Sequence, residues 1–258
     1  MIDTPNTRKV LEKLRKYTDK KILIKHMDEF HHPAFSGPVS YLGIVDDTPE
    51  CIIIFLSERC PEETFIHEIL HKILHYEGFP VVFINERFAR SNLPQNMIRA
   101  LPKLQGYFSS TIDHPEVFRR METDYTLDLN KYYEIQVNQK LNRFKKILKN
   151  NNPEDIGYFF YRQQDILIGL DYFLFGNCKE KIIEVFKQHF PDAYQSCMSL
   201  YKKTSKVGFS TPQSAYKSAQ LIKKHIINYG ERKSIYKEFN DIWKALEIRL
   251  NRNLVHFT

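Results

Sequence analysis

The stretch Phe65-Ile66-His67-Glu68-Ile69-Leu70-His71 decides how the first part of this chain folds, and it contains an HExxH motif. On a helix, residues four positions apart share one face, so His67 and His71 can direct their imidazoles at one point in space. Two histidines placed this way supply half of a zinc site, and Glu68 can take a proton from a zinc-activated water. The motif therefore predicts a metal-binding helix with a catalytic carboxylate.

The residues around the motif favour a buried helix that follows a strand. Cys51–Leu56 is short, apolar and rich in β-branched residues, as expected for a strand inside a sheet. Pro61 with Glu62 and Glu63 forms a conventional helix start, and Gly78 marks the helix end. Between them, apolar residues form a seam that would bury the helix: Ile66, Ile69, Leu70, Ile73 and Leu74.

The whole pattern predicts an α+β fold with a mainly α-helical C-terminal region. Before the motif we expect a helix over 4–17 and strands over 21–25 and 39–45. Beyond residue 84 helical periodicity dominates, in the segments 94–104, 115–124, 129–148 and most of 154–250. The run Asn150-Asn151-Asn152-Pro153 predicts a linker, so we expect an α+β metal-binding domain over 1–150 and a helical domain over 151–258.

Composition narrows the class of protein. The 258 residues are 42% hydrophobic, with no apolar run of about 18 residues, so no transmembrane helix is expected. The first residues lack the apolar core of a signal peptide. The cysteines have no CxxC spacing and are expected to be free thiols, which makes a cytoplasmic protein the default: Cys51, Cys60, Cys178 and Cys197.

A catalytic zinc needs three protein ligands and a water, and His114 is the preferred third ligand. In Ile112-Asp113-His114-Pro115-Glu116 the proline and the acid predict a helix start, whose positive end would favour the neutral, metal-binding imidazole. His75 continues the four-residue series, but two turns beyond His67 it has moved away from the metal. Three carboxylates stay open as alternatives: Glu116, Glu86 and Glu122.

Two further groups of side chains are candidates for the same centre. The first is a second histidine cluster, although adjacent residues rarely ligate one metal together: His26, His31 and His32. The second is a donor for the oxyanion, which such sites usually add. Its candidates follow His114 closely, and the sequence does not select among them: Tyr125, Arg119 and Arg120.

The segment 41–75 resembles the core of the zincin-type zinc metallopeptidases and, within that group, is most similar to the ImmA/IrrE-like proteins. There too a β-hairpin ending in an apolar strand leads through a polar turn and acidic residues into HExxH. Another histidine follows four residues on, as His75 does here. The resemblance implies a zincin-like metallopeptidase domain over 1–150, Zn²⁺ at His67 and His71, and the general base at the intervening glutamate.

This chain departs from the family pattern at three positions. Leu70 stands where the family usually has glycine, and Lys72 stands where zincin patterns mostly keep an uncharged residue. The family takes its third ligand from a helical glutamate in an alanine-rich segment, for which Asn85-Glu86-Arg87-Phe88-Ala89 is a poor match.

The leading hypothesis is a zinc-dependent hydrolase, a metallopeptidase that acts on a peptide or protein substrate. Its helical C-terminal region would bind that substrate or a regulatory protein partner. The alternative is a nucleic-acid-associated or regulatory binding protein with an inactive zincin fold, since the net charge is +7 and two basic stretches could contact phosphates: Tyr201-Lys202-Lys203 and Lys223-Lys224-His225. A third hypothesis is a degenerate zincin that holds metal without turnover.

Overall fold

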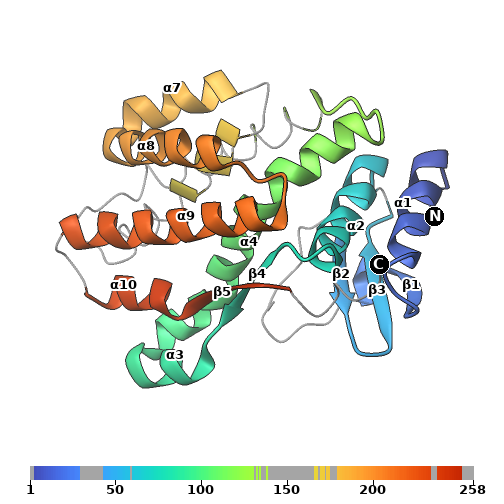
Figure 1. The fold of residues 1–258 in the computed structure, drawn as a ribbon, viewed down its shortest axis with the longest axis horizontal. Coiled ribbons are helices and arrows are strands. Elements are labelled where there is room, and N and C mark those ends of the chain that lie inside the picture. Colours follow the sequence, from blue (N-terminus) through green and yellow to red (C-terminus); the bar gives the residue numbers. More distant parts are fainter. Residues whose placement is uncertain are drawn as a thin grey trace. The chain divides into compact units, whose positions relative to one another are not determined.

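A computed structural model gives the fold of the chain (Figure 1). It describes residues 3–29, 43–58, 60–130, 132, 134, 138, 166, 167, 169–171, 173, 174, 179–233 and 237–251. These residues form helices and two small sheets, so the predicted α+β class is confirmed. They cluster into two compact units whose segments alternate along the chain, the first being 1–78, 117–127 and 251–258, and the second 79–116 and 128–250.

The first unit holds a three-stranded sheet in the order β1-β3-β2. β3 lies in the middle, parallel to β1 and antiparallel to β2, with Lys21 opposite Cys51 and Gly43 opposite Leu56. The predicted helix and strands of this region are confirmed, while the predicted strand residues 39–42 lie outside the described part. The elements are α1 (Pro5–Arg15), β1 (Lys21–His26), η1 (Met27–Glu29), β2 (Gly43–Asp47), β3 (Cys51–Leu56) and α2 (Glu62–Tyr76).

The core of the first unit lies where α1 and the sheet meet α2. Thr4 caps α1 by accepting a hydrogen bond from the backbone of Thr7, and this fixes the start of the helix. Fully buried aliphatic side chains from α1, β3 and α2 then fill the interior: Val10, Leu14, Ile52, Ile54, Ile66, Ile69, Leu70, Ile73 and Leu74. This apolar burial holds α2 in place along its whole length.

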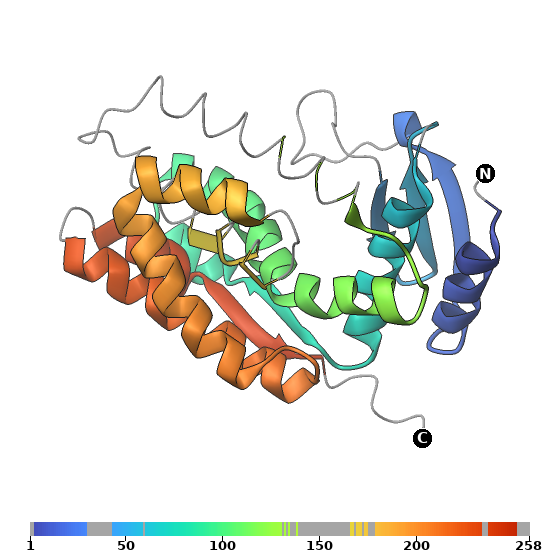
Figure 2. The ribbon, with the colours of Figure 1, turned by 90° about the horizontal axis from the view of Figure 1, so that it is seen from above.

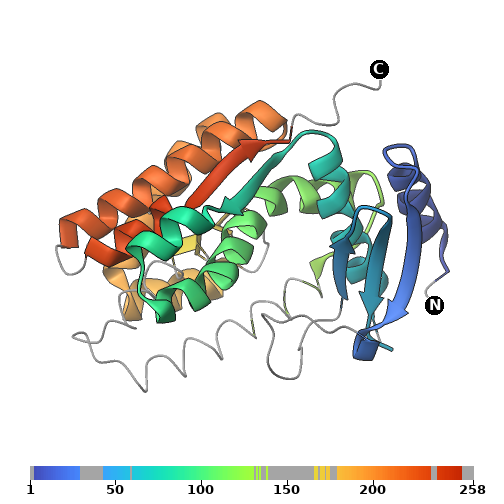
Figure 3. The same cartoon turned by 90° about the horizontal axis from the view of Figure 1, so that it is seen from below.

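The second unit is mainly helical. In it α8 packs against both α7 and α9 (Figure 2), and α9 runs along a two-stranded ribbon of β4 and β5 (Figure 3). In its core the rings of Phe108 and Trp243 pack edge to face, with their centroids 5.4 Å apart. The elements are β4 (Pro80–Ile84), α3 (Glu86–Asn92), α4 (Gln95–Thr123), α7 (Lys179–His189), α8 (Pro191–Val207), α9 (Pro212–Lys233), α10 (Lys237–Lys244) and β5 (Leu246–Leu250).

The helix α4 corrects the prediction of two separate helices over 94–104 and 115–124. It is one helix of 29 residues, with Pro102 and Pro115 in its interior. A proline removes a backbone donor and usually ends a helix. Here, buried residues at helical spacing on both sides of Pro115 keep the helix going: Leu101, Leu104, Phe108, Ile112, Val117, Phe118 and Met121.

The strand β5 corrects the prediction that helix extends through 154–250. Leu246-Glu247-Ile248-Arg249-Leu250 pairs antiparallel with β4, with Leu246 opposite Ile84 and Leu250 opposite Pro80. Its apolar and polar residues alternate, as in a half-buried strand. The predicted division of the chain at residue 150 lies among residues outside the described part, and it stays a prediction.

Candidate metal centre

The motif helix α2 begins and ends where the sequence predicts. Pro61 is its N-cap residue, and Glu62 and Glu63 occupy the first turn, where carboxylates complement the positive helix end. At the other end Gly78 has a positive φ of 88°, a backbone conformation that glycine adopts without strain. The helix therefore holds the motif in its middle, clear of both ends.

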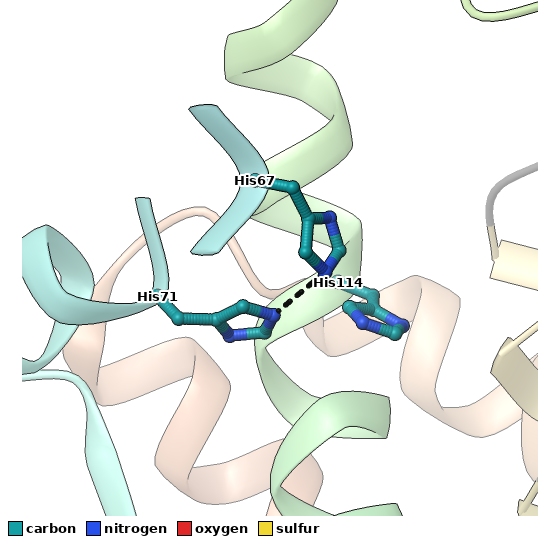
Figure 4. Close-up of side chains that lie close together, drawn as sticks. All are labelled: His67, His71 and His114. Atoms are coloured by element: carbon teal, nitrogen blue, oxygen red, sulfur yellow. Dashed lines mark hydrogen bonds between the residues drawn. The ribbon is translucent and has the colours of Figure 1, made fainter. Parts of the chain in front are cut away.

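His67 and His71 point toward each other from one face of α2 (Figure 4). Their Nε2 atoms lie 3.1 Å apart, and their rings are nearly perpendicular, with centroids 4.7 Å apart. His67 is only 6% exposed, and the ring of Phe118 on α4 packs against it at 5.3 Å. The predicted convergence of the two motif histidines is therefore present in the structure.

His114 joins them from α4 (Figure 4). It stands one helical turn before Phe118, so the helix that covers His67 also presents this third imidazole. One ligand atom from each of the three histidines lies within 4.8 Å of the others, and among the described residues this is the group that could hold a metal ion. The expected position of His114 at a helix N-terminus is wrong, because it lies inside α4, so the predicted helix-end effect does not act on it.

Asp171 contacts one ring nitrogen of His114, Nδ1. Nδ1 of His114 lies 2.9 Å and 3.0 Å from the two carboxylate oxygens of Asp171. Sequence reasoning missed this residue. A signal was present, since Asp171 is the one charged residue in the apolar run 166–175, but nothing in the sequence pairs it with a histidine 57 positions earlier.

The environment of Glu68 alters its acidity. Burial raises the pKa of Glu68 to about 7, and the neighbouring His71 lowers it by a smaller amount. A carboxyl group with a pKa near neutrality can both accept and return a proton during a reaction. This is the behaviour predicted for a general base at this position.

The carboxylate alternatives for a third ligand are not part of the histidine cluster. Glu116 lies buried on α4, while Glu86 is exposed and paired with Arg90 at 2.9 Å. Glu122 is exposed. His75 also lies outside the cluster, and His26 contacts Asp28 at 3.1 Å, whereas His31 and His32 are outside the described residues.

Arg120, a predicted oxyanion donor, instead joins α4 to the end of α2. Its Nη2 donates to Oε2 of Glu77 at 2.6 Å, and the Tyr17 hydroxyl donates to the other oxygen at 2.8 Å. Burial on its own would raise the pKa of Glu77, but the hydrogen bond and charge of Arg120, helped by Tyr17, hold it below its usual value. The other two candidates contact different groups: Arg119 donates to Thr123, and the ring of Tyr125 lies under the ammonium group of Lys9.

Lys72, which departs from the zincin pattern, has a local partner. Its ammonium group lies 3.3 Å from Asp47 at the end of β2, and Lys20 contacts the same carboxylate at 2.7 Å. Burial alone would raise the pKa of Asp47, but the two lysines keep it low. A charged residue directly after the motif is therefore compatible with this fold.

Two of the residues in the basic stretches, Lys223 and His225, contact other groups inside the protein. The ammonium group of Lys223 donates to the carbonyl of Leu246 at 2.6 Å, and burial lowers its pKa. His225 is buried and bonded to Ser196 at 2.7 Å. Lys202, Lys203 and Lys224 are exposed, which fits the solvated surface of a helix as well as a phosphate contact.

Comparisons with protein families, with curated proteins and with solved structures find no match to this chain. The likeness to zincin metallopeptidases therefore rests on the motif and its surroundings alone. No helix among the described residues is long and apolar enough to cross a membrane.

Proposed function

We propose that this protein is a zinc-dependent hydrolase, with His67, His71 and His114 as metal ligands and Glu68 as general base. The observation that carries the proposal is the meeting of three imidazoles from two helices, one of them outside the motif. A chance HExxH would not bring a third histidine from 43 positions further along the chain to the same point.

The donor set fits zinc in kind and in spacing. Two nitrogen ligands, each about 2.0–2.1 Å from a tetrahedral zinc, lie roughly 3.4 Å apart. The motif histidines stand 3.1 Å apart, and the third donor is near enough for a small side-chain rotation to complete the set. Three protein ligands would leave a fourth position for water or substrate, as in catalytic zinc sites.

The residues of this chain then have separate tasks. Bound zinc would supply Lewis acidity, which lowers the pKa of water and polarises a carbonyl group. Glu68 would accept the proton of the attacking water and return it to the leaving amine. Phe118 and the apolar side chains of α2 would exclude water from one side of the centre, which strengthens electrostatic effects there. A peptide bond is the substrate that we propose, by analogy with other HExxH helices.

The test is the zinc content of the purified protein, measured by elemental analysis after dialysis. We expect one zinc per chain in the native protein and in His75→Ala, and none in His67→Ala. The His75→Ala variant is the matched control, since it removes a histidine from the same helix outside the cluster. A native protein without zinc, or a His67→Ala variant that keeps it, would overturn the proposal.

A further inference from the structure

We propose that Asp171 is a positioning residue for the metal centre, acting through His114. This inference rests on the proposed function and extends it beyond the ligands themselves. Nδ1 of His114 lies 2.9 Å and 3.0 Å from the two Asp171 oxygens, and because an ionised carboxylate only accepts, Nδ1 is the donor of this shared hydrogen bond. Both side chains are mostly buried, at 16% and 15% exposure, so water competes little for this contact.

The contact determines which ring nitrogen can bind a metal. A neutral imidazole carries one N–H and one lone pair, and a carboxylate at Nδ1 holds the proton there. The lone pair then lies on Nε2, the nitrogen on the opposite side of the ring. In this way Asp171 fixes both the tautomer and the rotation of His114, as carboxylates do behind metal-binding histidines in general.

The contact also contributes charge. Three neutral imidazoles bring no negative charge to a divalent cation, whereas a carboxylate hydrogen-bonded to one of them makes that ring a stronger donor. His67 and His71 obtain their geometry from the spacing within α2. His114 comes from a different helix and needs a separate restraint, and Asp171 supplies it.

The experiment measures zinc affinity at pH 7.5 by competition with a chromophoric chelator. In Asp171→Asn an oxygen can still accept the Nδ1 hydrogen bond but the charge is gone, so we expect affinity to fall about 10-fold. In Asp171→Ala both are lost, and we expect a fall of about 100-fold. Asp171→Glu, which restores the charge, should recover part of this loss.

Asp241→Asn is the matched control, because Asp241 is also 15% exposed and pairs with Lys244 rather than with a histidine. We expect its zinc affinity to equal that of the native protein. Cobalt(II) spectra give a second readout, because an altered His114 ligand shifts the visible bands, which a loss of stability alone would not do.

The native protein supplies a test that needs no variant. Long-range proton–nitrogen NMR spectra of the metal-free chain should show His114 with its proton on Nδ1. A proton on Nε2, or Asp171→Ala with native zinc affinity, would overturn the inference about Asp171 while the zinc site stands. A native chain that binds no zinc would overturn both.

Discussion

The helices α2 and α4 both contribute to the candidate centre, but they hold their histidines by different means. α2 has 15 residues, a distinct start and end, and two histidines one turn apart. α4 has 29 residues, two internal prolines and a single histidine of the cluster. That histidine is oriented by the carboxylate of Asp171, 57 positions away in the sequence. His67 and His71 instead lie one turn apart on the same helix, and this spacing brings their imidazoles together.

The difference divides the candidate centre into two halves. The local half is the motif on α2, with His67 and His71, and the long-range half is His114 with Asp171. The local half needs only that α2 forms, since helical spacing alone brings the two imidazoles together. The long-range half needs α4 to continue past Pro115 and the Asp171 contact to be made. Substitutions in the two halves should therefore have distinguishable effects.

The largest effect is expected from the local half, at Glu68. In Glu68→Gln the proton acceptor is lost while the ligands are unchanged, so peptide hydrolysis should fall about 10²–10⁴-fold with zinc still bound. Peptidase assays alongside zinc analysis measure both quantities. Equal activity in the native and variant proteins would show that the glutamate of the motif has no catalytic part.

Removal of zinc should have the next largest effect, a loss of thermal stability, because the ligands of the two halves would no longer be held by one ion. A ligand at about 1,000 times its dissociation constant stabilises the folded state by about 4 kcal/mol. For a chain of this size that corresponds to a fall in Tm of roughly 8–16 °C on adding a chelator. Calorimetry measures it, and the Tm of His67→Ala should not respond to the chelator. If the chelator also leaves the Tm of the native protein unchanged, bound zinc does not stabilise the folded protein.

His114→Ala tests the long-range half directly. Loss of a ligand should exceed the effect of losing the residue behind it, so zinc affinity should fall more than about 100-fold, or about 2.8 kcal/mol. Titration against a chelator measures the change, with His75→Ala as the control. If His114→Ala binds zinc as the native protein does, the centre consists of the local half alone.

The smallest effect concerns the contact between the end of α2 and α4, made by Glu77 and Arg120. Glu77→Gln should cost about 1–2 kcal/mol at neutral pH, since the buried charge of Arg120 loses its partner. The folded-state pKa of Glu77 lies below its usual value of 4.5, so its stabilisation is complete above about pH 5 and is lost as the pH falls through the folded-state pKa.

Urea denaturation at pH 7 and pH 3.5 measures this contribution. The stability gap between the native protein and Glu77→Gln should be present at pH 7 and shrink at pH 3.5. Glu86→Gln, which removes an exposed carboxylate, should match the native protein at both values. A gap of the same size at both pH values would contradict the role of the Glu77 charge.

The local half of the centre was predictable, and so was much of the fold around it. Helical spacing, the Pro61 start and the Gly78 end are all properties of neighbouring residues, and the structure confirms each of them. The sequence favours His114 as third ligand, but the helix N-terminus that it predicts there is wrong, because His114 lies inside α4. Buried contacts on both sides of Pro115 keep the helix intact, and such contacts are not visible in local sequence.

The remaining features depend on residues that are far apart in the chain. Asp171 was identifiable as a charge in an apolar run, but not as the partner of His114. The alternation in Leu246–Leu250 is typical of a strand, yet it follows a long helical region and its partner β4 lies more than 160 positions earlier. Tertiary contacts therefore determine both the pairing of Asp171 with His114 and the strand conformation of Leu246–Leu250.

The pairing of β4 with β5 has a consequence for the order of folding. β4 begins four residues after α2 ends, and the side chain of Asn251, directly after β5, donates to the carbonyl of His75 inside α2 at 3.0 Å. These contacts join residues separated by most of the chain, and contacts of that kind form slowly. During synthesis the motif helix can therefore be made early, but the contact of Asn251 with its C-terminal end forms only after residue 251 has been added to the chain.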